Sequence, residues 1–174
     1  FYKKFVRGKI ISIGSFQNNF KHNHKRKINQ ILFLSTYRPK NVRQDPAWHQ
    51  HDDVVIRGIY RLAKKNNIKF NILGRSTDSE ENEIKYYSNI LNTDKFSFIP
   101  KNKNKDSYKI MQSYKYIFTT FSTLANENLG NGGRSGIFLY KPRNNQAHLL
   151  RLGYGQIEGL KNKGPFWVNT KKYN

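Results

Sequence analysis

The sequence contains no cysteine, few acidic residues and no long hydrophobic run. With 0 Cys in 174 residues, the chain has no disulfide framework, no thiolate zinc site and no cysteine nucleophile. No stretch approaches the roughly 18 apolar residues of a membrane span, and residues 1–7 do not form a secretory signal. The first residue is Phe1 rather than Met, so we expect a piece of a longer protein.

Acidic residues are scarce beside basic ones. The chain has 11 Asp and Glu against 32 Lys and Arg, which gives a formal net charge of +21. Such a charge attracts phosphates, anionic lipid headgroups or nucleic acid. The chain is also rich in Asn, Lys, Ile, Tyr and Phe, a bias that an AT-rich genome produces without selection for binding. The charge therefore indicates an anionic partner without choosing among the three.

Aromatic residues are abundant although the hydrophobic fraction is low. Aromatics make up 14% of the chain, within a hydrophobic fraction of 36%. A chain of this length can bury one ordinary core. We therefore expect one folded domain plus ends, with an aromatic and β-branched core rather than a leucine-rich one.

From Gln30 onward, short apolar runs alternate with amphipathic segments. The pattern predicts strands at 31–35, 70–73, 96–99, 116–120 and 135–140, and helices at 52–66, 80–92 and 106–113. The apolar face predicted for the first helix consists of Val55, Ile59, Leu62 and Ala63, with Asp52 and Asp53 at its positive end. The alternation predicts an α/β fold, a doubly wound Rossmann-like parallel sheet with helices on both faces.

The domain organisation follows from the same pattern. We predict an N-terminal strand (8–16) and basic linker within 1–29, the Rossmann-like domain at 30–142, and a C-terminal extension at 143–174 that packs on the domain. His22 and His24 lie in the basic linker without accompanying carboxylates, which favours a solvated loop over a metal site. A long loop at 36–51 would carry Trp48, His49 and His51.

The segment 114–134 predicts a short buried strand, a hydroxyl-rich turn and a short helix ended by glycine. Ser122 is the expected N-cap, with a side chain that accepts a hydrogen bond from a first-turn N–H. The remaining N–H groups and the helix dipole would face an approaching phosphate. Gly130, Gly132 and Gly133 would supply left-handed positions. Ordinary capping explains the same residues without any ligand.

Two arginines follow parallel strands of the predicted sheet. In the strand order 3-2-1-4-5, strand 31–35 lies beside strand 116–120 and the ligand crevice opens between their carboxyl ends. Arg38 leaves the first of these strands and Arg75 leaves the next strand along the chain. Forked guanidinium donors together with helix N–H groups suit a diphosphate.

Four segments carry a resemblance to a known family. Ile-Leu-Gly-Arg-Ser at 72–76, Asp-Ser-Tyr-Lys-Ile-Met-Gln-Ser-Tyr at 106–114, Thr-Phe-Ser-Thr-Leu-Ala-Asn-Glu-Asn-Leu-Gly at 120–130 and Gly-Pro-Phe-Trp at 164–167 resemble the carboxyl-terminal half of GT-B-type glycosyltransferase-like proteins of surface-carbohydrate biosynthesis. The resemblance covers about residues 8–170.

The resemblance implies a nucleotide-sugar donor domain. By that analogy Ser122 and Thr123 contact phosphate, Glu127 binds the ribose hydroxyls and Arg75 adds a phosphate contact. Arg38 is expected to contact the donor from its position after strand 31–35. In such enzymes a preceding acceptor domain often supplies the catalytic base, so no catalytic residue is assigned in this chain. The Gly-rich segment 130–133 predicts that the donor helix is short here.

The sequence thus favours the donor-binding domain of a metal-independent glycosyltransferase in surface polysaccharide or lipopolysaccharide biosynthesis. We expect no cofactor, a nucleotide-activated sugar as substrate, a carbohydrate or lipid-linked acceptor, and a cytoplasmic location at the inner face of the membrane. One alternative is a nucleotide-sugar 2-epimerase-like enzyme of the same fold. Another is a basic nucleic-acid-binding domain, which the Lys, Arg and aromatic content would suit. A third, compatible with the donor-binding interpretation, is a domain that associates peripherally with a membrane surface.

Overall fold

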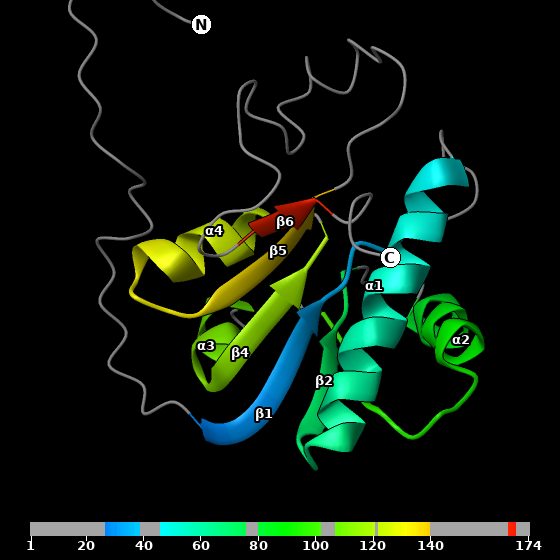
Figure 1. The fold of residues 1–174 in the computed structure, drawn as a ribbon, viewed down its shortest axis with the longest axis horizontal. Coiled ribbons are helices and arrows are strands. Elements are labelled where there is room, and N and C mark those ends of the chain that lie inside the picture. The colour runs from blue at the N-terminus through cyan, green and yellow to red at the C-terminus, as the bar shows by residue number, and fades with distance from the viewer. Residues whose placement is uncertain are drawn as a thin grey trace, which may run out of the picture.

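The computed structural model describes residues 27–38, 46–75, 80–101, 107–120, 122–139 and 167–169. The predicted strand 8–16, the histidines His22 and His24 and most of the C-terminal extension lie outside these residues. The described strands form a six-stranded sheet in the order β3-β2-β1-β4-β5-β6 (Figure 1). The strands are β1 Lys27–Leu34, β2 Lys69–Leu73, β3 Ser97–Ile99, β4 Tyr114–Thr119, β5 Ser135–Leu139 and β6 Trp167–Asn169.

Every neighbouring pair of strands in the sheet is parallel. The chain winds outward from β1 to β3, returns to β4 beside β1, and then continues outward to β6. The predicted Rossmann-like fold class is therefore confirmed, and so is the placement of β1 beside β4, where Phe33 is in register with Phe118. Strand β6 adds a neighbour to β5 that the predicted order did not include.

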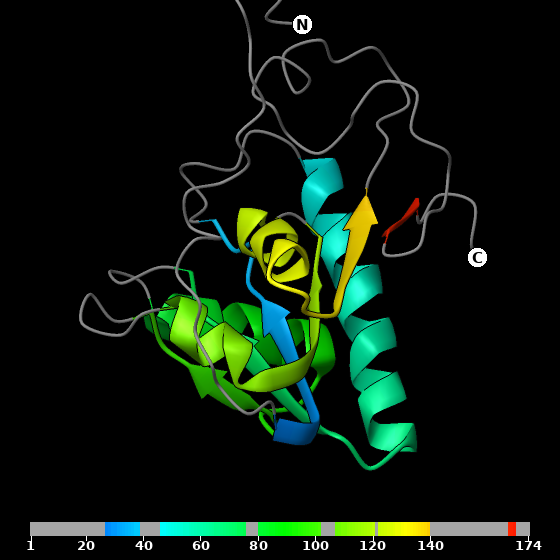
Figure 2. The ribbon, with the colours of Figure 1, turned by 90° about the vertical axis from the view of Figure 1, so that its left-hand side faces the viewer.

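Helices cover both faces of the sheet, as Figures 1 and 2 show. Helices α1 (Pro46–Lys65) and α2 (Glu80–Leu91) lie on one face, and α3 (Ser107–Gln112) and α4 (Thr123–Gly130) lie on the other. The core beneath α1 and α2 is aromatic and β-branched, with Phe33, Phe70 and Tyr87 among several isoleucines. The core beneath α3 and α4 contains more leucine, including Leu32 and Leu34. The expected core composition therefore describes one face only.

Helix α1 begins earlier than the sequence pattern predicts. It starts at Pro46, within the segment predicted to be a loop, so Trp48, His49 and His51 belong to a helix. Proline suits the first turn of a helix because its missing N–H would have no partner there. The first turn of α1 has no acidic residue, so Asp52 and Asp53 do not lie at the positive end of the helix as expected.

The buried face of α1 also differs from the prediction at one position. Val55, Ile59 and Ala63 are buried as predicted, but Leu62 is 50% exposed. Ile56, which is fully buried, takes the place expected for Leu62. Residues 55, 56, 59 and 63 follow the spacing of a single helical stripe, whereas 62 falls outside it.

No helix in the described residues is long and apolar enough to cross a membrane.

We predict opposite effects of alanine at two glycines. A Cβ at Gly58, in the exposed part of α1, would meet nothing within 4 Å, so Gly58→Ala should raise the free energy of unfolding by about 0.4–1 kcal/mol. A Cβ at Gly74, at the end of β2, would lie 2.7 Å from the Phe98 ring. Gly74→Ala should therefore lower the free energy of unfolding by about 1–3 kcal/mol. Urea unfolding of the two variants checks this, and equal effects would contradict the packing described.

Candidate functional site

The candidate site lies at the carboxyl ends of β1 and β4. These two strands are neighbours, and the chain leaves them toward opposite sides of the sheet. Such a topological switch point is where open α/β sheets bind ligands, because the two departing connections leave a crevice between them. The residues that follow the two strands are therefore the first candidates for ligand contact.

Hydroxyl groups join the two strand ends across the switch point. Thr36, which follows β1, lies with its Oγ1 3.1 Å from Oγ1 of Thr120, which follows β4. Beneath this pair, Thr119 Oγ1 donates to the Leu34 carbonyl at 3.3 Å. All three threonine side chains are buried. The floor of the switch point is therefore polar and its geometry is fixed by side-chain hydrogen bonds between distant parts of the chain.

Helix α4 begins near this floor, at Thr123, three residues after Thr120. Ser122 occupies the N-cap position with φ −122° and ψ 129°, as predicted, but its hydroxyl makes no capping hydrogen bond. The backbone N–H of Ala125 donates to the Ser122 carbonyl at 3.1 Å. The earlier N–H groups of a helix have no carbonyl within the helix to bond. The predicted side-chain cap is thus wrong, and the Ser122 hydroxyl is left beside N–H groups suited to an anion.

Glu127 lies one turn further along α4. It is four residues after Thr123, so the two side chains share one side of the helix. Within the described residues, its Oε2 is buried and has no hydrogen-bond partner. A buried carboxylate oxygen in a native protein normally accepts a hydrogen bond. Glu127 therefore carries an acceptor oxygen that no described residue uses.

The end of α4 is short and tight, as the Gly-rich segment predicts. Helix α4 spans 8 residues and ends at Gly130. Only Gly132, of the three glycines expected to be left-handed, has a positive φ, at 71°. Gly133 instead packs so closely on Asn128 that a Cβ would lie 2.1 Å from the side-chain oxygen. Asn128 in turn donates to Ser135 Oγ at 2.9 Å and so ties the helix to β5.

The two predicted arginines leave the same edge of the sheet. Arg38 follows β1 and is half-buried, and Arg75 follows β2 and is exposed. Because β1 and β2 are hydrogen-bonded neighbours, both connections start at adjacent points on the carboxyl edge. The structure therefore gathers Arg38, Arg75, Ser122 and Thr123 along one edge, and their roles toward a ligand remain predictions.

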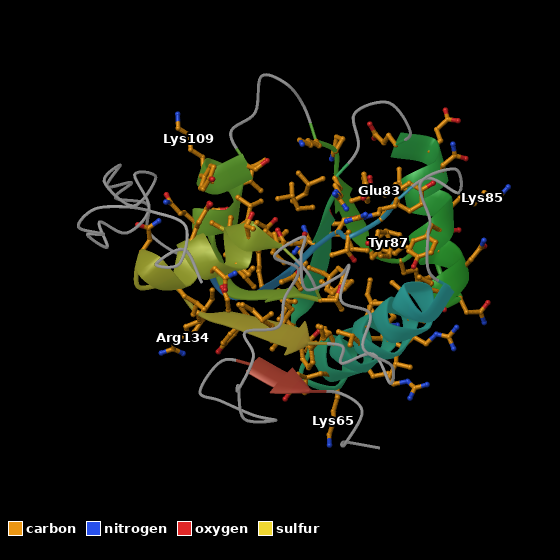
Figure 3. The ribbon with its side chains drawn as sticks, turned by 90° about the horizontal axis from the view of Figure 1, so that it is seen from above. Lys65, Glu83, Lys85, Tyr87, Lys109 and Arg134 are labelled. Atoms are coloured by element: carbon orange, nitrogen blue, oxygen red, sulfur yellow. The ribbon has the colours of Figure 1, made fainter. Side chains whose placement is uncertain are left out.

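A buried carboxylate forms hydrogen bonds to the residues that follow β1 and β2. The sequence analysis did not single it out. Glu83, in the first turn of α2, is fully buried and points toward the ends of β1 and β2 (Figure 3). It accepts hydrogen bonds from the Ser35 hydroxyl and from the Arg75 backbone N–H, whose distances to Oε1 and Oε2 are 3.0 and 3.2 Å. One carboxylate thus fixes the residues that lead into both arginine-bearing connections.

Tyr87 completes this network from the next turn of α2. Its hydroxyl lies 2.8 Å from Ser35 Oγ and accepts a hydrogen bond from the Thr36 N–H at 3.3 Å. Tyr87 is fully buried. Glu83 lies four residues before Tyr87, so the helical periodicity that buries Tyr87 is the sequence signal that could have placed Glu83 on the buried face.

Comparisons with known proteins add a family but no relative. A family model described as "putative O-antigen biosynthesis protein" matches residues 1–173. No curated protein and no solved structure matches the chain. The family description supports a setting in surface-carbohydrate biosynthesis and carries no statement about GT-B enzymes or nucleotide-sugars.

In the described residues, no group of three or more His, Cys, Asp or Glu side chains is placed to hold a metal ion.

We predict that Glu83 stabilises the fold strongly through its buried hydrogen bonds. Glu83→Ala leaves a buried Ser35 hydroxyl and Arg75 N–H without their acceptor, and each such loss costs about 1–3 kcal/mol. The free energy of unfolding should fall by about 3 kcal/mol in total. The matched control is Glu81→Ala in the same turn, because Glu81 is exposed. Its effect should stay within about 0.5 kcal/mol, and equal losses in urea unfolding would contradict the network.

Proposed function

This chain belongs to that O-antigen biosynthesis family, and from this membership and the site geometry we propose that it binds the nucleotide-sugar donor of a glycosyl transfer in surface-carbohydrate biosynthesis. The observation that carries the proposal is the switch point itself. Helix α4 starts there with an N-cap hydroxyl that its own helix does not use, above the bridged pair Thr36 and Thr120.

Each part of a nucleoside diphosphate has a suitable partner at this edge. The first-turn N–H groups of α4, with Ser122 and Thr123, suit the phosphate oxygens. The unpartnered Oε2 of Glu127 suits a ribose hydroxyl as donor. Arg38 and Arg75 enter the same edge from the connections after β1 and β2, where guanidinium forks can bind further phosphate oxygens.

The proposed chemistry is breakage of the bond between the anomeric carbon of the sugar and the diphosphate oxygen. As that bond breaks, negative charge grows on the departing diphosphate. The helix N–H groups and the two arginines stabilise this charge without requiring a metal ion. The acceptor hydroxyl, on a carbohydrate or lipid-linked acceptor, forms the new bond to the anomeric carbon and gives up its proton to a general base. The proposed location is the cytoplasm, at the inner face of the membrane.

We predict that one nucleoside diphosphate binds stoichiometrically in calorimetric titrations with UDP, GDP and CDP at near-physiological salt. Glu127→Ala should weaken that binding by about 1–3 kcal/mol because the ribose hydroxyl loses a charged acceptor. The matched control is Asp94→Ala, which removes an exposed carboxylate from the turn between α2 and β3 and should leave the affinity unchanged.

Ser122→Ala separates a ligand contact from a structural role. Because the Ser122 hydroxyl makes no capping hydrogen bond, its removal should leave the free energy of unfolding within about 0.5 kcal/mol of the native value. The diphosphate affinity should nevertheless fall by about 0.5–1.5 kcal/mol. If no nucleoside diphosphate binds and a single-stranded oligonucleotide binds instead, the donor-site proposal is wrong.

A further inference from the structure

Helix α1 presents an exposed face that its own fold does not use. Its buried stripe is Val55, Ile56, Ile59 and Ala63, and the opposite side faces outward. The basic residues on that side are all exposed, and they are Arg57, Arg61, Lys64 and Lys65. The segment 54–65 contains no Asp or Glu. From Arg57 to Lys65 this face is therefore a stripe of positive charge about 12 Å long.

Two exposed aliphatic side chains accompany these cations, Val54 within the stripe and Leu62 at its border with the buried face. Val54 is 69% exposed and Leu62 is 50% exposed, and these are the exposed large hydrophobic residues of the described chain. At 100° per residue, Val54, Arg61, Leu62 and Lys65 fall within one side of the helix. On a bilayer surface, cations of this kind bind anionic lipid headgroups while neighbouring exposed aliphatic side chains enter the boundary of headgroups and acyl chains.

A hollow continues the basic stripe past the end of α1. It has a volume of about 630 Å³ and opens at the amino ends of β2 and β3. Its lining includes three lysines, Lys64, Lys69 and Lys95, and three aromatic residues, Tyr60, Phe70 and Phe96. Lys64 Nζ lies 5.6 Å from the centre of the Tyr60 ring. Tyr60 donates its hydroxyl to the Lys95 carbonyl at 3.2 Å. Ammonium groups beside a tyrosine suit a phosphate headgroup at the boundary of water and lipid.

We propose that the exposed face of α1, named here the α1 basic face and comprising Val54, Arg57, Arg61, Leu62, Lys64 and Lys65, docks this protein on an anionic lipid bilayer. Charge complementarity provides the long-range attraction. Val54 and Leu62 favour lipid over nucleic acid, because a phosphodiester backbone offers nothing apolar at that spacing. The hollow opens at the amino edge of the strands and the donor site at the carboxyl edge, so the two do not compete.

The test is flotation of the full chain with vesicles of phosphatidylcholine alone or with about a third phosphatidylglycerol. We expect binding only to the anionic vesicles. Arg57→Glu with Arg61→Glu should weaken it about 25-fold or more, since each cation near an anionic surface contributes about fivefold. The matched control is Lys109→Glu with Arg134→Glu, which changes the net charge equally on exposed residues away from α1 (Figure 3). Equal weakening by both pairs would overturn the proposal.

A second variant distinguishes lipid from other polyanions. Leu62→Ser leaves the charge unchanged and should weaken vesicle binding by about fivefold to tenfold, because an exposed leucine inserts its apolar surface into the bilayer. Binding of a single-stranded oligonucleotide by the same variant should not change. Oligonucleotide binding that needs Arg57 and Arg61, without any vesicle binding, would assign the α1 basic face to nucleic acid instead. Failure here leaves the donor-site proposal standing, because no α1 residue belongs to that site.

Discussion

The carboxyl edge of this sheet depends on the buried carboxylate of Glu83. It accepts hydrogen bonds from Ser35 at the end of β1 and from the Arg75 N–H at the end of β2. A fully buried acid would be costly without such donors. The two strand ends therefore have their positions fixed by a helix that comes between β2 and β3 in the chain. The residues that follow, including Arg38 and Arg75, start from a rigid base.

The rest of the candidate site extends from that base across the switch point. Ser35, held by Glu83 and Tyr87, leads to Thr36, and Thr36 is bridged to Thr120 before α4 begins. A rigid floor beneath a helix N-terminus suits an anionic ligand, because donors that are already placed need no reorganisation when the ligand binds. The family of the chain gives this site its setting, and the hollow beside the α1 basic face opens at the opposite, amino edge of the strands.

Much of the fold could be predicted from the sequence, because buried parallel strands are continuous apolar runs and helices repeat every 3.6 residues. The position of Ser122 at the start of α4 followed from the same local pattern. The hydrogen bonds of the site could not be predicted. Thr36 and Thr120 are 84 residues apart and Ser35 and Glu83 are 48 apart, so their pairing depends on the tertiary fold. The orientation of the Ser122 hydroxyl depends on a side-chain rotamer, which the sequence does not specify.

The central claim is that a nucleoside diphosphate occupies the switch point between β1 and β4. The most direct measurement is amide hydrogen exchange of the full chain with and without a saturating nucleoside diphosphate. The account predicts slower exchange in residues 35–38, 74–75 and 119–125, which are the strand ends and the start of α4, with little change in α1. Protection confined to residues 60–70, beside the basic hollow, or no protection at the switch point would contradict it.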